Sequence, residues 1–111
     1  MKINIKPLSV NQAWKGKRFK TDKYKVYEQE LMFILPKDAY IPEKEIVLCL
    51  IFGFSSKLSD FDNPVKPFVD CLQKKYGFND RMIKRCIIDV MLVKKGQEFI
   101  DFRMTDYHDN F

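Results

Sequence analysis

The pattern of hydrophobic and polar residues predicts a strand and then a helix in the first third of the chain. Isoleucines alternate with polar residues over residues 3–5, as they do in a strand with one buried face. After a loop that runs to residue 20, apolar side chains recur every three or four positions over residues 24–34. This spacing predicts an amphipathic helix that Thr21 or Asp22 caps and a following proline ends.

A buried strand and a second helix are predicted in the middle of the chain. Residues 45–54, EIVLCLIFGF, are an almost continuous run of β-prone side chains, which is typical of a central strand buried on both faces. The second helix is expected to begin at Asp62 or Asn63 and to run to about Tyr76. Gly77 then provides the residue that most often ends a helix.

Two further strands complete the predicted fold. Residues 84–93 and 98–106 are apolar or alternating segments, and the turn KKGQ between them predicts a β-hairpin. The whole pattern predicts an α+β (mixed α/β) single domain over residues 1–111, with a mixed β-sheet and two helices. A chain of 111 residues that is 46% hydrophobic is long enough for one core and too short for two.

The rest of the composition excludes several classes of site. No apolar run approaches the ~20 residues of a membrane span, and the first residues lack the apolar core of a secretory signal, so a cytoplasmic protein is expected. Cys49, Cys71 and Cys86 form no CxxC pair, and their apolar surroundings predict buried reduced thiols. The single histidine, His108, lies near the C-terminal end, which is a poor position for a catalytic group.

The positive charge is concentrated near the N-terminus. The formal net charge is +5, and residues 1–30 hold eight basic and three acidic side chains. Within this region Trp14, Phe19 and Tyr24 alternate with lysines, which is typical of a loop that grips phosphates and stacks on bases. A solvated lysine-rich loop explains the charge alone equally well. The candidate DNA-binding residues are Lys15, Lys17, Arg18, Lys20 and Lys23.

An acidic cluster follows in this otherwise basic chain. Asp62, Lys66 and Asp70 are spaced four residues apart, so a helix that begins at residue 62 would place them on one face. Carboxylates that repel one another and a phosphate backbone favour a bound divalent cation, with Mg²⁺ expected and Mn²⁺ as an alternative. The structural alternative is that Asp62 caps the helix and that Lys66 and Asp70 form a surface ion pair worth ~0.3–0.5 kcal/mol.

The same segment resembles a known family. Residues 60–83 follow the pattern D-x-D-N-x-x-K-x-x-x-D-x-L, then a G-F turn, an acidic pair and an apolar residue. This pattern is similar to that of the RusA-type Holliday junction resolvases (crossover junction endodeoxyribonucleases), small nucleases of bacteria and their phages. The matching residues are Asp60, Asp62, Asn63, Lys66, Asp70, Leu72, Gly77, Phe78, Asp80 and Ile83.

The resemblance implies a homodimer that binds four-way DNA junctions and cuts them with paired, metal-dependent nicks during recombination and repair. It also implies that Asp60, Asp62 and Asp80 are catalytic, metal-binding carboxylates and that Lys66 is an essential catalytic lysine. Asn63, Asp70 and Asn79 would support the site. The chain departs from the family at Asn79, where an acidic residue is usual, and in its shorter turn.

Two other functions remain open at this point. One is a non-catalytic protein that binds or shapes four-way junctions, because Asn79 weakens the match at a ligand position. The other is a basic interaction domain whose acidic cluster only caps a helix. Metal-dependent hydrolysis is favoured because carboxylate-held Mg²⁺ activates water and neutralises charge at a phosphodiester.

Overall fold

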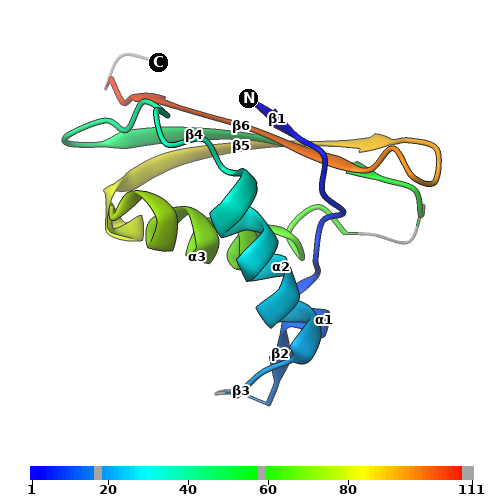
Figure 1. The fold of residues 1–111 in the computed structure, drawn as a ribbon. Coiled ribbons are helices and arrows are strands. Elements are labelled where there is room, and N and C mark those ends of the chain that lie inside the picture. Colours follow the sequence, from blue (N-terminus) through cyan, green and yellow to red (C-terminus); the bar gives the residue numbers. More distant parts are fainter. Residues whose placement is uncertain (17–18, 58–59, 109–111) are drawn as a thin grey trace.

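A four-stranded mixed sheet forms one layer of the protein, and the helices pack against one of its faces (Figure 1). The computed structural model describes residues 1–16, 19–57 and 60–108. β4 pairs in parallel with β5 and antiparallel with β6, and β1 pairs antiparallel with β6. The strands are β1 (Lys2–Ile3), β4 (Ile46–Phe54), β5 (Ile83–Leu92) and β6 (Phe99–Asp106), in the sheet order β1-β6-β4-β5.

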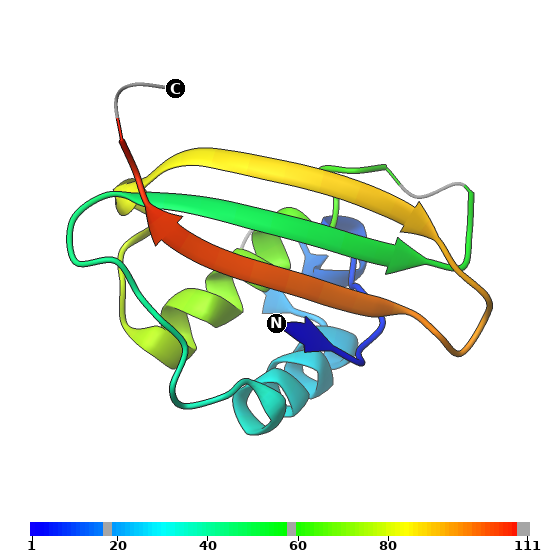
Figure 2. The same ribbon diagram turned by 90° about the horizontal axis from the view of Figure 1, so that it is seen from above.

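The second layer consists of helices on one side of this sheet (Figure 2). The helices are α1 (Val10–Ala13), α2 (Asp22–Ile34), α3 (Val65–Tyr76) and a 3-10 turn, η1 (Asp80–Met82). β2 (Trp14–Lys15) and β3 (Phe19–Lys20) form a separate antiparallel hairpin, which projects from the helical side (Figure 1). The predicted α+β domain, with a mixed sheet and two main helices, is confirmed. None of the helices in the described ranges is long and apolar enough to cross a membrane.

Helix α2 has the bounds that its sequence predicts. The Thr21 side chain accepts a hydrogen bond from the backbone N–H of Tyr24 at 3.2 Å, and this caps the first turn. The buried face carries Tyr24, Tyr27 and Leu31. Leu35 closes the last turn in an extended conformation directly before Pro36, which cannot continue a helix.

The predicted hairpin of the last two strands is wrong. β6 pairs with β4 and not with β5, so β4 lies between the two strands that follow it in the chain. The connection over residues 93–98 is long enough to pass the end of β4, because neighbouring strands lie only ~5 Å apart. Val93 donates its N–H to the carbonyl of Phe54 at 2.7 Å, and this bond holds the start of the connection against the end of β4.

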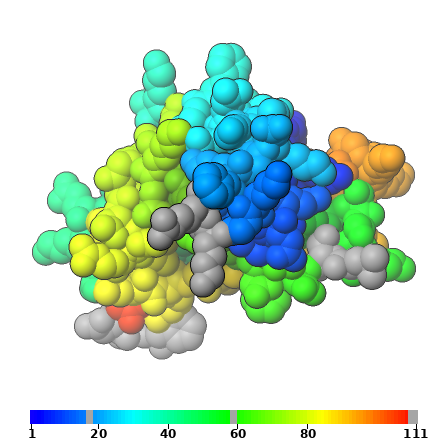
Figure 3. Space-filling view, turned by 90° about the horizontal axis from the view of Figure 1, so that it is seen from below, coloured from blue at the N-terminus to red at the C-terminus, as the bar shows by residue number. Residues whose placement is uncertain are grey.

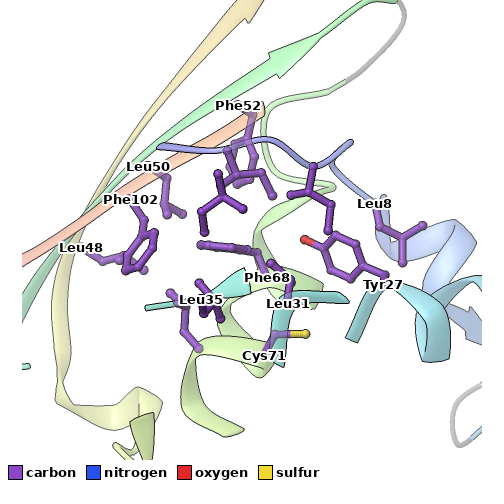
Figure 4. Close-up of a cluster of buried hydrophobic side chains, with 14 of the residues drawn as sticks. Leu8, Tyr27, Leu31, Leu35, Leu48, Leu50, Phe52, Phe68, Cys71 and Phe102 are labelled. Carbon is purple, nitrogen blue, oxygen red and sulfur yellow. The ribbon is translucent and has the colours of Figure 1, made fainter. Parts of the chain in front are cut away.

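The core lies between the sheet and the helices (Figure 4). The Phe68 ring of α3 lies edge-on to Phe52 of β4 and to Phe102 of β6, with ring centroids 6.4 and 5.7 Å apart. The prediction that β4 is buried on both faces holds only in part. Cys49 and Ile51 face away from the helices and are half-buried, because no helix of the described residues covers the second face of the sheet (Figure 1).

Candidate functional site

Helix α3 begins two or three residues later than the sequence predicts, because the expected start was Asp62 or Asn63. Its first residue is Val65, whose N–H bonds to the carbonyl of Asp62 at 3.2 Å, and Asp62 itself lies in the preceding turn. Proline explains the shift. Pro67 has no N–H and sits in the first turn of the observed helix, where that N–H would have no partner in any case. In a helix beginning at residue 62 its ring would clash with the carbonyl of Asn63.

Four of the predicted site residues nevertheless line one depression, which we call the acidic hollow. Asp62 comes from the turn before α3, Lys66 and Asp70 from α3, and Asp80 from the turn after it. The hollow has a volume of about 510 Å³. Its apolar lining comes from α3, β4 and β5, namely Val65, Val69, Leu48, Ile83, Cys86 and Ile88.

Hydrogen bonds within α3 connect two of these side chains. The Lys66 Nζ lies 3.3 Å from the Asp70 carboxylate, in the predicted one-turn spacing. Gln73 donates to the other Asp70 oxygen at 3.5 Å and accepts the backbone N–H of Asp80 at 3.0 Å. Gln73 therefore links Asp70 to the turn that carries Asp80. The sequence reasoning missed it, although it lies one turn after Asp70 on the same helix face.

Two features of the chain bring Asp80 back to the hollow. Gly77 ends α3 in the left-handed conformation at φ 77°, which reverses the chain without steric strain. Asn79 then accepts the N–H of Arg81 at 2.9 Å and caps the 3-10 turn that holds Asp80. The Asn79 side chain therefore organises this turn. That it supports a metal site stays a prediction.

Asp60 lies in a neighbouring depression of about 340 Å³ and does not line the acidic hollow. Asn63 donates to the Asp60 carboxylate at 3.4 Å, and its carbonyl accepts the N–H of Val10 at 2.8 Å. Asn63 therefore links the turn before α3 to the first residue of α1. Figure 3 shows the corresponding face, on which the N-terminal segment in blue lies against the green segment before α3.

The residues that could hold a metal ion are only partly assembled. Among the described residues, no three histidine, cysteine, aspartate or glutamate side chains are close enough together to hold a metal ion. Asp62 and Asp80 share the acidic hollow, and Mg²⁺ is commonly held by one or two carboxylates with water in its other positions. The chemistry of these two donors therefore fits Mg²⁺. That Asp60, Asp62 and Asp80 act together stays a prediction.

The basic segment forms a hairpin where the sequence predicted a loop. In β2 and β3, Trp14 pairs with Lys20 and Lys15 pairs with Phe19. Lys15 is exposed, and so is Lys23 in the first turn of α2. The other two candidates, Lys17 and Arg18, lie outside the described residues.

Only one of the three aromatic side chains expected to stack on bases is exposed. Tyr24 is buried, and the Trp14 ring packs edge-on against it with centroids 5.2 Å apart. These two rings therefore attach the hairpin to α2, and Trp14 is left half-buried. Phe19, at 71% exposure, remains available at the hairpin.

A third depression connects the hairpin to the acidic hollow. It has a volume of about 600 Å³ and shares Lys66 and Asp70 with the hollow. Its other lining residues come from α1 and the hairpin, namely Val10, Asn11, Trp14 and Gly16. A ligand that extends from the acidic hollow past Lys66 and Asp70 would therefore also meet Trp14 and Gly16 of the hairpin.

Glu28 of α2 ties the hairpin and α3 together. Its carboxylate accepts hydrogen bonds from Lys20 at 2.8 Å and from Lys74 at 2.7 Å. Burial alone would raise the pKa of Glu28, but the hydrogen bonds from Lys20 and Lys74 outweigh it and lower the pKa below 4.5. Lys20 also lies 5.1 Å above the Tyr24 ring, so this predicted DNA-binding lysine already has partners within the fold.

Glu28→Gln is expected to lower the free energy of unfolding at pH 7 by about 0.5–1 kcal/mol, the scale of exposed ion pairs. Because its pKa is lower in the folded state, Glu28 stabilises the fold above pH 4.5, and this stabilisation is lost as the pH falls through the folded pKa. Urea unfolding at pH 7 and at successively lower pH values measures the effect, which should shrink as the pH falls below 4.5. Glu30→Gln, an exposed change on the same helix, is the control. An equal loss at every pH value would contradict this role.

The cysteines differ from one another, which corrects the prediction of three buried thiols. Cys71 is buried, and burial raises the pKa of its thiol to about 12. Cys49 is half-buried and Cys86 is exposed. Cys86 is exposed because β5 lies at the edge of the sheet, a position that its apolar sequence does not reveal.

No family model and no curated protein matches this sequence.

Proposed function

We propose that this protein is a Mg²⁺-dependent, structure-selective endodeoxyribonuclease that resolves four-way DNA junctions in recombination and repair, as its RusA-like motif implies. One observation carries the proposal. Asp62, Lys66 and Asp80 are separated in the sequence, yet they line a single hollow that adjoins the basic hairpin. Two carboxylates and a lysine beside a phosphate-binding surface suit hydrolysis of a phosphodiester.

In this proposal the residues of the hollow have different roles in catalysis. Asp62 and Asp80 would hold Mg²⁺, which supplies Lewis acidity at the scissile phosphate when bound. The Lys66 side chain is 63% exposed, so its ammonium can donate to a phosphate oxygen and stabilise the charge that develops there. Asp70 orients Lys66, and Gln73 holds Asp70 against the turn that carries Asp80.

The basic hairpin would bind the DNA backbone next to this hollow. Lys15 and Lys23 are exposed there, and each lysine that neutralises a phosphate releases counterions. Junction binding should therefore weaken steeply as the salt concentration rises. Phe19 supplies an exposed ring for contact with an unstacked base.

The proposal is tested by incubating a labelled synthetic four-way junction, and a linear duplex of the same sequence, with Mg²⁺ or with EDTA. Paired nicks in the junction alone, absent in EDTA, would support it. Cleavage of both substrates would contradict the structural selectivity. The absence of cleavage in both Mg²⁺ and Mn²⁺ would contradict the nuclease activity.

The second candidate is a junction-binding protein without nuclease activity. It is favoured by the separation of Asp60 from the acidic hollow and by the engagement of Asn79 in capping, which leaves two carboxylates that are free for a metal ion. Salt-sensitive, junction-selective binding without cleavage would identify this function. Binding and cleavage assays under the same conditions distinguish the two candidates, because both bind the junction and only the nuclease cuts it.

A further inference from the structure

The depression between the basic hairpin and α3 has a lining that suits a flat aromatic ligand with polar edges. Its volume of about 600 Å³ lies within the ~300–1,000 Å³ range of small-molecule sites. The hairpin contributes Trp14 and Gly16, and α1 contributes Asn11. The remaining polar lining, Lys66 and Asp70, is shared with the acidic hollow, so a ligand in one cavity adjoins the other.

We propose that this depression, which we call the base site, binds one unstacked nucleobase, from the nucleotide whose phosphate lies at Lys66. Trp14 would stack on the face of the base, and Asn11 would hydrogen-bond to its edge. The inference deepens the proposed function and rests on it, because it takes DNA as the ligand. It adds a contact with a base to a surface that otherwise contacts phosphates.

The Trp14 ring has a face that its neighbour Tyr24 does not cover. The two ring planes are 88° apart, with centroids 5.2 Å apart. An edge-on contact covers at most one face of either ring, so Tyr24 leaves at least one face of Trp14 uncovered. Trp14 is half-buried and lines the depression. The contact with Tyr24 therefore holds the indole in place, and stacking on a base needs only the other face.

Asn11 offers hydrogen bonds of the kind that a base edge needs. Its side chain is exposed on α1, and no described residue forms a hydrogen bond with it. A carboxamide carries a donor and an acceptor side by side, which matches the neighbouring donor and acceptor groups on the edges of bases. The capping box of Ser9 and Gln12 fixes the short helix that carries Asn11. The side chain is therefore presented on an ordered element.

The charges of the lining favour a base over a phosphate. Among the described residues of the depression, Lys66 and Asp70 carry the only charges, and they lie 3.3 Å apart as an ion pair. A phosphate in the depression would meet the Asp70 carboxylate together with the lysine, whereas a neutral base meets no such repulsion. The exposed lysines Lys15 and Lys23 do not line the depression, so they stay available to the DNA backbone.

The base site can accept only a base that has left the helical stack. Neighbouring base pairs cover both faces of a base inside a continuous duplex, so stacking on Trp14 requires the base to move out. This movement costs least where the base is already unpaired or single-stranded. The base site would therefore favour DNA with unstacked bases over continuous duplex, which adds a source of structural selectivity beside the acidic hollow.

The fluorescence of Trp14 tests the base site directly, because it is the single tryptophan of the chain. The full chain is titrated in EDTA with a dye-labelled oligothymidylate and with an abasic strand of equal length, which keeps the phosphate charges. The oligothymidylate should quench Trp14 and bind about tenfold more tightly by anisotropy, the scale of one base–aromatic contact. A continuous duplex should bind without quenching. Equal affinities for the two strands, no quenching, equal quenching by the duplex, or no binding of either strand would overturn the proposal.

Three variants locate the contact. Asn11→Ala should weaken oligothymidylate binding about fivefold, the scale of one hydrogen bond, and leave binding of the abasic strand unchanged. Gln29→Ala removes an exposed carboxamide from α2 outside the depression and is the matched control. An equal effect of both changes would contradict the role of Asn11. Circular dichroism shows that each variant is folded.

The third variant, Phe19→Ala, removes the exposed ring of the hairpin. It should keep the full quenching of Trp14 at saturation, because Phe19 does not line the depression. Loss of the quenching would mean that Phe19 brings the base to the hairpin, and this would overturn the proposal. Quenching without cleavage of the four-way junction would contradict the nuclease activity alone. Cleavage of the junction without quenching would contradict the base site alone.

Discussion

Asp62→Asn is expected to slow junction cleavage by about a hundredfold to a thousandfold, the range for removing one electrostatic group from a catalytic centre. The change keeps the shape of the side chain and removes one negative charge from the acidic hollow. Junction affinity should stay the same or rise, because one carboxylate fewer repels the phosphates. Single-turnover cleavage rates and gel-shift titrations at one salt concentration measure the two effects separately.

Asp80→Asn should reproduce the loss, because Asp80 lines the same hollow as Asp62. Asp38→Asn, an exposed change outside the hollow, is the matched control and should leave the rate unchanged. If the cleavage rate is unchanged in both Asp62→Asn and Asp80→Asn, the acidic hollow is not the catalytic site. If Asp38→Asn also slowed cleavage, the loss would reflect the net charge of the protein and not the acidic hollow.

Asp60→Asn distinguishes two forms of the site. If the hollow works with two carboxylates, this variant should lose much less activity than Asp62→Asn, because Asp60 lies in the neighbouring depression. A loss as large as that of Asp62→Asn would mean that the turn before α3 rearranges when DNA binds. Asn63 is the side chain that would have to release Asp60 in that case.

Local signals in the sequence predict the helices well and the sheet order poorly. The bounds of α2 follow from Thr21 and Pro36, which act within one turn of the helix. The order of the strands depends on contacts between residues far apart in the chain, and both β5 and β6 have the apolar pattern of a strand beside β4. Only the tertiary structure decides that β4 separates them. The short helix α1 was missed, although Ser9 and Gln12 form a capping box that is visible in the sequence.

The candidate site shows the same division. The contact between Lys66 and Asp70 follows from helical spacing alone. The approach of Asp80 requires the reversal at Gly77, whose glycine is a recognisable signal, and then the capped turn at Asn79. The position of Asp60 depends on where the turn meets α1, through the Asn63 carbonyl. No local pattern in the sequence predicts that contact. The spacing of Asp62, Lys66 and Asp70 suggested one helix face, but Pro67 shifts the start of α3 so that Asp62 lies outside the helix.

Phe68→Ala is expected to lower the free energy of unfolding by about 3–5 kcal/mol, the usual cost of removing a buried aromatic ring. Phe68 is fully buried and packs against Phe52 and Phe102, so it fixes α3 to two strands of the sheet. Small domains have only about 5–15 kcal/mol of stability in total, so this variant should be near the limit of folding. Urea unfolding followed by far-UV circular dichroism measures the loss.

Phe33→Ala makes the same chemical change on the surface and is the matched control. The Phe33 side chain of α2 is 88% exposed, so its removal should change the stability by less than about 0.5 kcal/mol. Similar losses in the two variants would contradict the packing of α3 described above. Because Lys66 and Asp70 flank Phe68 on α3, a partly folded Phe68→Ala protein should also lose junction cleavage at temperatures where Phe33→Ala remains active. Restoring cleavage by cooling would show that Phe68 acts on the acidic hollow through the stability of α3 and not through contact with the substrate.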